Sequence, residues 1–148
     1  MRRVEVVCTG NICRSPIGEV VLRAKLAEAG IDDVVVTSSG IGGWHHGDRM
    51  DSRAAAVLAR HGYDGSAHRA REFEGFTDRD LVLAMDSGHL AFLRRRGGRD
   101  LVVPVELFAD AEVPDPYYGD ESGFEDVLLQ IEKAADTWVE KLRPGRFR

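Results

Sequence analysis

One stretch near the N-terminus decides the fold of this chain: Val6-Val7-Cys8-Thr9-Gly10-Asn11-Ile12-Cys13-Arg14-Ser15-Pro16. The valine-rich residues 3–7 at its start predict a buried strand. At its end, Ser15 suits an N-cap and Pro16 the first position of a helix, which Gly30 would terminate. We therefore expect a loop that joins a strand to the N-terminus of a helix.

The rest of the chain alternates between strand-like and helix-like segments. Further strands are expected at 34–37, 81–85 and 101–105, and further helices at 51–60, 88–96 and 124–142. Such alternation predicts an α/β fold, a doubly wound and mostly parallel sheet with helices on both faces. Ligands bind such sheets beyond the carboxyl ends of the strands, which points to the loop after Val7. With no repeat or linker, residues 1–148 are expected to form a single domain.

Composition narrows the class of protein further. The 148 residues carry 20 Lys plus Arg against 25 Asp plus Glu, a net charge of −5, and 43% of them are hydrophobic. This is the composition of a globular protein, and its acidity argues against nucleic-acid binding. No apolar run approaches the roughly 20 residues that span a bilayer, and no signal-peptide pattern opens the chain. We expect a cytoplasmic protein with neither a nucleic-acid nor a membrane partner.

Cys8 has the strongest chemical signal in the sequence. A cysteine placed before a helix N-terminus faces unpaired N–H groups, which stabilise a thiolate and also bind oxyanions. Arg14, six residues later, offers a planar fork to two phosphate oxygens. Gly10 and Asn11 suit left-handed positions that turn successive N–H groups inward. Together these residues predict a nucleophile inside a phosphate-binding loop.

A thiolate that attacks phosphorus needs an acid to protonate the leaving group. The segment Pro114-Asp115-Pro116-Tyr117-Tyr118 follows the fourth expected strand, at the same edge of the sheet. Asp115, between two prolines, is the candidate acid. Asp110 and Asp120 compete with it, because sequence spacing alone does not separate the three.

The two motifs resemble those of the low-molecular-weight protein tyrosine phosphatase family. Residues 8–16 match its signature loop and Asp115-Pro116-Tyr117-Tyr118 its general-acid loop, while Ser38, Trp44 and His68-Arg69-Ala70-Arg71 follow the family's order. The resemblance implies a flavodoxin-like, three-layer fold with a four-stranded parallel sheet. It also implies a two-step reaction that uses no metal and no cofactor.

The same resemblance assigns roles to individual residues. Cys8 would attack the phosphoryl group and form a phosphocysteine, Asp115 would protonate the leaving phenol, and Ser15 would donate a hydrogen bond to the cysteine sulfur. The phosphate oxygens would be held by Arg14 and the loop residues Thr9, Gly10, Asn11, Ile12 and Cys13. Ser38 and His68 would support Asn11. The aromatic walls of the substrate slot would be Trp44, Tyr117 and Tyr118.

Several alternatives stay open at this level. Cys13 would be the redox partner of Cys8 by resemblance, or else a small residue that only packs the loop. Protein-arginine phosphatases resemble this chain over its full length, but the bulky Ile12 favours phosphotyrosine where a small Thr would admit a guanidinium. A non-catalytic phosphate-binding module is the third possibility. The expected partners are tyrosine-phosphorylated proteins, with inorganic phosphate and other oxyanions as product or inhibitors.

Overall fold

The computed structural model describes residues 1–144. The strands are β1 (Arg2–Cys8), β2 (Val34–Gly40), β3 (Leu81–Ala84) and β4 (Val105–Leu107), and the helices are α1 (Arg14–Glu28), α2 (Ser52–Arg60), α3 (Ser87–Gly97) and α4 (Glu121–Leu142). The strands form one sheet in the order β2-β1-β3-β4, and every pair is parallel. Because the order changes direction at β1, the crevice for a ligand lies beyond the end of that strand, next to Cys8.

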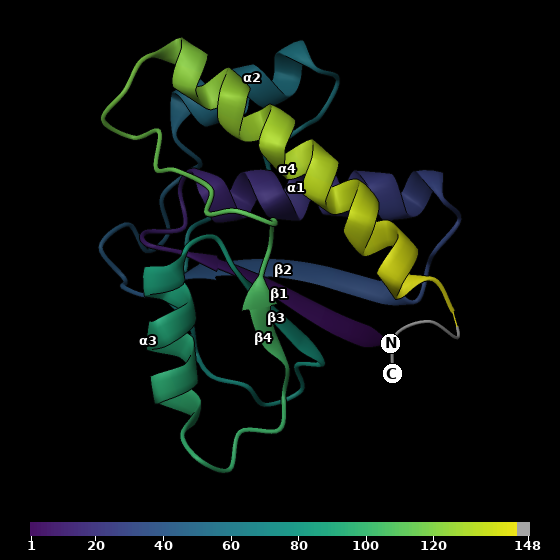
Figure 1. Cartoon of the computed structure of the whole chain (residues 1–148). Coiled ribbons are helices and arrows are strands. Elements are labelled where there is room, and N and C mark those ends of the chain that lie inside the picture. Colours follow the sequence, from purple (N-terminus) through teal and green to yellow (C-terminus); the bar gives the residue numbers. More distant parts are fainter. Residues whose placement is uncertain (145–148) are drawn as a thin grey trace.

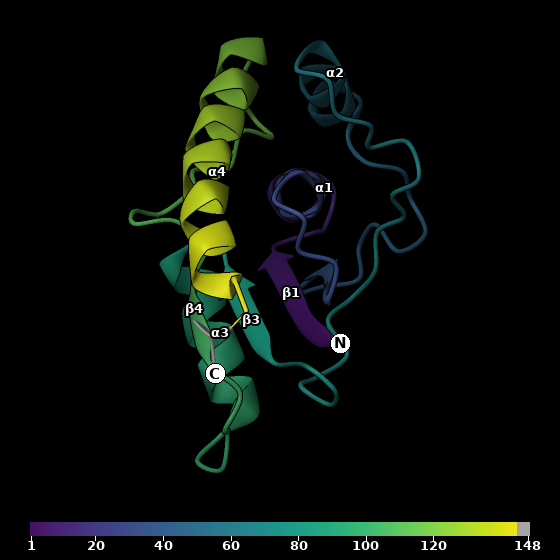
Figure 2. The same cartoon turned by 90° about the vertical axis from the view of Figure 1, so that its right-hand side faces the viewer.

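Helices cover both faces of the sheet, as expected. Figure 1 shows α1 and α4 on one face and α3 on the other. Successive side chains of β1 point to opposite faces of the sheet, so the protein has a hydrophobic core on each face. Val4 and Val6 pack with α1 and α4, whereas Val7 packs on the opposite face with Leu93 of α3. Helix α2 lies beside α4, outside the sheet layer (Figure 2).

Two expectations about local structure were wrong. The fourth strand begins at Val105 instead of covering 101–105, because Leu101 closes a turn onto Gly98 and the Val102 side chain is exposed. Ser15 is not the N-cap of α1. Cys13 occupies that position, and the Ser15 hydroxyl is used inside the phosphate-binding loop. The other strands and helices agree with the expected ranges to within a few residues.

Within residues 1–144, no helix is both long enough and apolar enough to cross a bilayer.

Candidate active site

The candidate nucleophile is the last residue of β1. Cys8 is buried, and its Sγ lies 2.9 Å from the Oγ of Ser15 in the first turn of α1. No side chain caps the N-terminus of α1 at Cys13. The N–H groups of that first turn are thus free to bind an anion beside the sulfur.

Asn11 organises the loop from within. Its backbone is left-handed, with φ of 61°, and its side chain is buried. The side-chain Nδ2 donates to the Oγ atoms of Ser15 (2.8 Å) and Ser38 (3.0 Å), while Oδ1 accepts from the backbone N–H of Arg71 (2.9 Å). His68 Nε2 lies 2.7 Å from the carbonyl oxygen of Asn11. Both expected supports, Ser38 and His68, therefore contact Asn11.

Burial lowers the pKa of His68 below its usual value. The ring is therefore neutral at neutral pH, and its Nε2–H donates to the carbonyl of Asn11.

Gly40, at the end of β2, is a part of the site that sequence reasoning missed. A Cβ on Gly40 would lie 2.7 Å from the carbonyl oxygen of Thr9 and 3.0 Å from the backbone nitrogen of Asn11. The next residue, Ile41, donates its N–H to the carbonyl of Cys8 at 2.9 Å. Only glycine lets the end of β2 approach the phosphate-binding loop this closely.

Arg14 is buried and held on several sides. Its Nη1 donates to Asp86 Oδ2 (2.8 Å) and to the carbonyl of Val113 (2.9 Å), and its Nη2 donates to Thr9 Oγ1 (3.2 Å). Nη2 also lies 3.6 Å from Asp115 Oδ2. The guanidinium is therefore locked in orientation before any oxyanion arrives.

Asp86, the N-cap of α3, holds Arg14, and His89 in the first turn of α3 contacts Thr9; both were missed in the sequence. The N–H of His89 and the Arg14 guanidinium, working against burial, keep the pKa of Asp86 below its usual value. Burial, and then the charge of Arg14, lowers the pKa of His89 to about 4. The Nε2 of this neutral ring lies 2.9 Å from Thr9 Oγ1. The usable signal was position, because Asp86 comes directly after the buried strand β3.

The three aspartates that competed for the acid role are now separated. Asp115 faces Arg14 and lines the same cavity as Cys8. Asp110 lines a different cavity, between α3 and α4, and Asp120 caps α4 by accepting from the N–H of Ser122. Only Asp115 is placed beside the cysteine.

The cavity above Cys8 has a volume of about 310 Å³. Its floor is polar and its rim is aromatic; it is lined by Cys8, Thr9, Gly10, Ile12, Cys13, Arg14, Trp44, His45, Asp115, Tyr117 and Tyr118. The Trp44 side chain is 70% exposed, Tyr118 is 91% exposed and Tyr117 is 37% exposed, so the three expected aromatic residues stand at the mouth. His45 is an additional lining residue that sequence reasoning missed.

The N-terminus of α2 connects the phosphate-binding loop to the loop of Asp115. The backbone N–H of Asp51 donates to the carbonyl of Ile12 at 2.9 Å, and the Asp51 carboxylate pairs with Arg53 at 3.0 Å. Arg53 in turn donates to the carbonyls of Tyr117 (2.8 Å) and Gly119 (3.0 Å). Arg53 therefore clamps the Asp115 loop onto the site.

Cys13 and Cys8 are both free and buried. Burial, and then the nearby carboxylate of Asp51, raises the pKa of the Cys13 thiol far above its usual range. Cys13 is therefore a protonated thiol in this structure and does not compete with Cys8 as the thiolate that attacks phosphorus. In the described part of the chain, no three His, Cys, Asp or Glu side chains are grouped to hold a metal ion.

Comparison with known proteins agrees with this geometry. The family model for low molecular weight phosphotyrosine protein phosphatase matches residues 3–146. A low molecular weight protein-tyrosine-phosphatase of Streptomyces coelicolor is 47% identical over 146 residues, covering 90% of this chain and 88% of the relative. The chain belongs to the low-molecular-weight protein tyrosine phosphatase family. It is a cysteine-based, metal-independent enzyme of the kind that forms a phosphocysteine intermediate.

Solved structures show the same fold. A protein tyrosine phosphatase from Entamoeba histolytica superposes with a TM-score of 0.94 at 30% identity, covering 99% of this chain and 100% of that one. A Drosophila arginine phosphatase superposes with a TM-score of 0.89 at 26% identity, covering 98% and 99%. The flavodoxin-like expectation for the fold is therefore confirmed.

Proposed function

We propose that this chain hydrolyses phosphotyrosine in proteins with Cys8 as nucleophile, Arg14 as phosphate clamp and Asp115 as general acid and base. One observation carries the assignment: these three side chains line a single cavity at the carboxyl end of β1. The proposed catalytic unit is one domain, with Thr9, Gly10, Asn11, Ile12 and Cys13 as its phosphate-binding loop.

In the first step the phosphoryl group binds between the loop amides and Arg14. The Cys8 thiolate attacks phosphorus in line with the leaving phenol oxygen, so that a sulfur–phosphorus bond forms as the phosphorus–oxygen bond breaks. Asp115 gives its proton to that oxygen. Arg14 and the N–H groups at the start of α1 stabilise the charge on the equatorial oxygens.

In the second step a water molecule replaces the phenol. Asp115, now a carboxylate, takes a proton from the water as its oxygen attacks phosphorus. The sulfur–phosphorus bond breaks, the electron pair returns to Cys8 and inorganic phosphate leaves. Ser15 donates a hydrogen bond to the departing sulfur, which stabilises the thiolate.

The direction of the Ser15 hydrogen bond follows from its neighbours. Its Oγ accepts from Asn11 Nδ2, so its single proton is left to donate. Two acceptors compete for that proton, the carbonyl of Ser39 at 3.2 Å and the sulfur of Cys8 at 2.9 Å. When Cys8 is a thiolate, the charged sulfur is the stronger acceptor.

The mouth of the cavity supports an aryl phosphate as substrate. Trp44, Tyr117 and Tyr118 offer apolar faces to a flat phenyl ring, and Ile12 adds a bulky apolar side chain to the lining. Phosphoarginine is the second candidate, favoured by the structural similarity to an arginine phosphatase. The ratio of kcat/KM on a phosphotyrosine peptide and on phosphoarginine separates the two, and we expect it to favour phosphotyrosine.

The test is hydrolysis of p-nitrophenyl phosphate and a phosphotyrosine peptide by the wild type and by Cys8→Ser. We expect turnover that survives a metal chelator, is inhibited by vanadate and is lost in Cys8→Ser. Activity that persists in Cys8→Ser would refute the assignment of the nucleophile. No turnover on any substrate would favour a phosphate-binding module.

Cys13 is proposed as a redox partner of Cys8. The cysteines are free and both line the same cavity, which supports a reversible disulfide between them after oxidation. Two free cysteines also fit a reducing compartment, and we propose the cytoplasm, which cell fractionation would test.

A further inference from the structure

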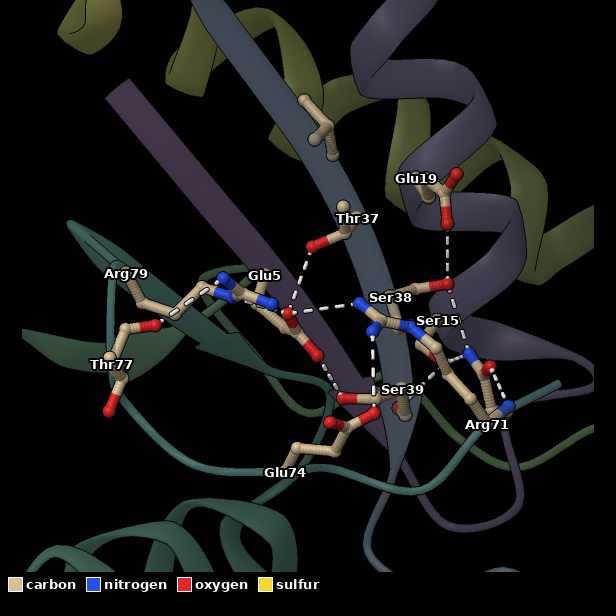
Figure 3. Close-up of polar contacts among 12 residues, drawn as sticks. Glu5, Ser15, Glu19, Thr37, Ser38, Ser39, Arg71, Glu74, Thr77 and Arg79 are labelled. Carbon is tan, nitrogen blue, oxygen red and sulfur yellow. Dashed lines mark hydrogen bonds and ion pairs between the residues drawn. The ribbon is translucent and has the colours of Figure 1, made fainter. Parts of the chain in front are cut away.

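Glu5 is a buried carboxylate that the proposed mechanism does not use. It lies in the middle of β1 and is 1% exposed. Its Oε1 accepts from Thr37 Oγ1 (2.9 Å), Arg79 Nε (2.6 Å) and Arg71 Nη2 (3.3 Å), and its Oε2 accepts from Ser39 Oγ. Figure 3 shows the two guanidinium groups approaching this one carboxylate. We call these five residues the Glu5 cluster.

Strand alternation explains why the cluster forms. Glu5 points to the face of the sheet that carries α3, and the parallel register places Thr37 opposite it on β2. The part of the chain between α2 and β3 supplies Arg71 and Arg79. A buried carboxylate is tolerated only when its lone pairs and charge are satisfied, and here four donors, two of them cationic, satisfy it.

Arg71 connects the cluster to the phosphate-binding loop. Its guanidinium bonds Glu5 and, through Nε, the carbonyl of Ser38 at 3.0 Å. Its backbone N–H donates to Asn11 Oδ1 at 2.9 Å. This last bond determines which end of the Asn11 carboxamide faces Ser15, so that Nδ2 donates to the serine and leaves the serine proton for Cys8.

We propose that Glu5 is a positioning residue for the phosphate-binding loop: by anchoring Arg71 it orients Asn11, and Asn11 directs the Ser15 proton to the sulfur of Cys8. This inference rests on the proposed function, in which the Cys8 thiolate is the nucleophile. Glu5 touches neither substrate nor sulfur and acts only through Arg71.

The Glu5→Gln variant keeps the size of the side chain but leaves Arg71 and Arg79 facing each other without an anion. The Arg71 side chain is already 32% exposed, with Glu74 4.0 Å away, so it can turn outward. The backbone at Arg71 keeps its 2.9 Å hydrogen bond from the Gly40 N–H to its carbonyl but loses the anchor of its side chain. The Arg71 N–H that orients Asn11 is then held less firmly. We expect kcat to fall about tenfold, less than the ~10²-fold that a 1 Å misplacement of a catalytic group can cost.

The decisive readout is the pH at which the Cys8 thiolate forms. It is measured without turnover, from the rate of iodoacetamide alkylation against pH in a Cys13→Ser background. We expect the midpoint in Glu5→Gln and in Arg71→Ala to rise by about one pH unit, because the thiolate loses a directed hydrogen bond. In the pH profile of kcat/KM, the midpoint of the acid limb should move to higher pH by the same amount.

Three further variants make the test specific. Arg71→Lys keeps a cation for Glu5 and should restore most of the wild-type profile. The double variant Glu5→Gln/Arg71→Ala should shift the alkylation midpoint no further than the single variants do, because both substitutions break the same Glu5–Arg71 contact. Asp33→Asn breaks the 2.9 Å Arg2–Asp33 ion pair at the other end of β1 and β2, and should leave the alkylation profile unchanged.

A lower melting temperature with an unshifted alkylation profile in Glu5→Gln and Arg71→Ala would overturn the proposal, leaving Glu5 a purely structural ion pair. If Glu5→Gln does not fold, the partly exposed Arg71→Ala carries the same test. Failure of the proposed function gives a different result, since Cys8→Ser would then retain phosphatase activity.

Discussion

The carboxylate of Asp115 lies with its Oδ2 3.6 Å from Nη2 of Arg14, on the open side of the phosphate-binding loop. The same carboxylate accepts the N–H of Tyr117 at 3.1 Å, which fixes it at the start of the aromatic wall. A phosphate ester held by Arg14 would therefore place its leaving oxygen next to Asp115. The proposed acid is thus positioned by the proposed phosphate clamp.

Replacing Asp115 with Asn should lower kcat/KM more for a substrate with a weakly acidic leaving group than for one with a strongly acidic leaving group. General acid catalysis is worth about 10²- to 10⁴-fold, so we expect kcat/KM on a phosphotyrosine peptide to fall about 100-fold or more. On p-nitrophenyl phosphate it should fall much less, because nitrophenolate leaves without a proton. Steady-state kinetics on both substrates measures the difference.

Inhibition by vanadate should persist in Asp115→Asn, because Arg14 and the loop amides are intact. Asp110→Asn is the matched control, since Asp110 lines a separate cavity, and it should behave as the wild type. Equal losses on the two substrates would show that Asp115 is not the general acid.

Arg53 should matter for turnover although it touches no reacting atom. Arg53→Ala removes both hydrogen bonds to the carbonyls of Tyr117 and Gly119, so the Asp115 loop loses its clamp. We expect kcat on phosphotyrosine to fall about tenfold with a smaller change in vanadate affinity. Arg53→Lys should recover only part of the loss, because an ammonium group cannot reach two carbonyls as a planar fork.

Arg60→Ala is the control for Arg53. Arg60 lies on the same helix and pairs with Glu125 of α4 at 2.9 Å, away from the cavity. Its loss should leave kcat unchanged. A similar fall of kcat in Arg53→Ala and Arg60→Ala would mean that both substitutions lower activity by destabilising the fold, and not by releasing the Asp115 loop.

The strand-to-helix loop was the part of the site that sequence predicted best. Cys8, Arg14 and Asn11 lie within a few residues of one another, so local geometry and residue chemistry suffice to place them. The capping role of Ser15 was mispredicted for the same reason, because local propensity cannot see that Cys8 and Ser39 compete for its hydroxyl. A tertiary contact overrode a local preference.

His89 should make the folded state sensitive to mild acid. Its pKa of about 4 in the folded state lies below the value near 6.5 of an unfolded chain. The unfolded state therefore binds more protons between these values, and stability falls as the pH drops from about 6.5 towards 4. The charged groups that act on the ring are Arg14, which opposes its protonation, and Asp86, Asp115 and Glu112, which favour it.

His89→Gln keeps an amide group within reach of Thr9 and removes the titration. Urea unfolding at pH 7 and at pH 5 should show a loss in the wild type that exceeds the loss in His89→Gln by ~2 kcal/mol. His46→Gln, which changes an exposed histidine away from Thr9, is the matched control variant and should unfold at the wild-type urea concentrations. Parallel pH dependence in the wild type and His89→Gln would contradict the low pKa.

Cys13 should make the oxidation of Cys8 reversible. Hydrogen peroxide converts the Cys8 thiolate to a sulfenic acid, and attack by Cys13 sulfur then forms a disulfide and releases water. We expect peroxide-treated wild type to regain most of its activity with dithiothreitol. In Cys13→Ser the sulfenic acid has no partner and proceeds to irreversible states, so recovery should be poor. Equal recovery in both would make Cys13 a packing residue.

The residues that sequence missed come from distant segments. Asp86 and His89 reach the site from the start of α3, Arg53 from α2 and Gly40 from β2, and no short motif joins them. Asp115 was separable from Asp110 and Asp120 only after the loop that follows β4 had been placed. Glu5 stands in a valine-rich strand, and its two arginine partners come from the distant segment between α2 and β3, which no local pattern connects to it.

Trapping the covalent intermediate on Cys8 tests the central claim most directly. The enzyme is mixed with excess p-nitrophenyl phosphate and quenched within milliseconds, and the peptide that contains Cys8 and Cys13 is examined by mass spectrometry. We expect one phosphoryl group on Cys8 in the wild type, a larger fraction in Asp115→Asn when water attack lacks its base, and none in Cys8→Ser. Turnover without a phosphoryl group on Cys8, or label on Cys13 instead, would contradict the mechanism.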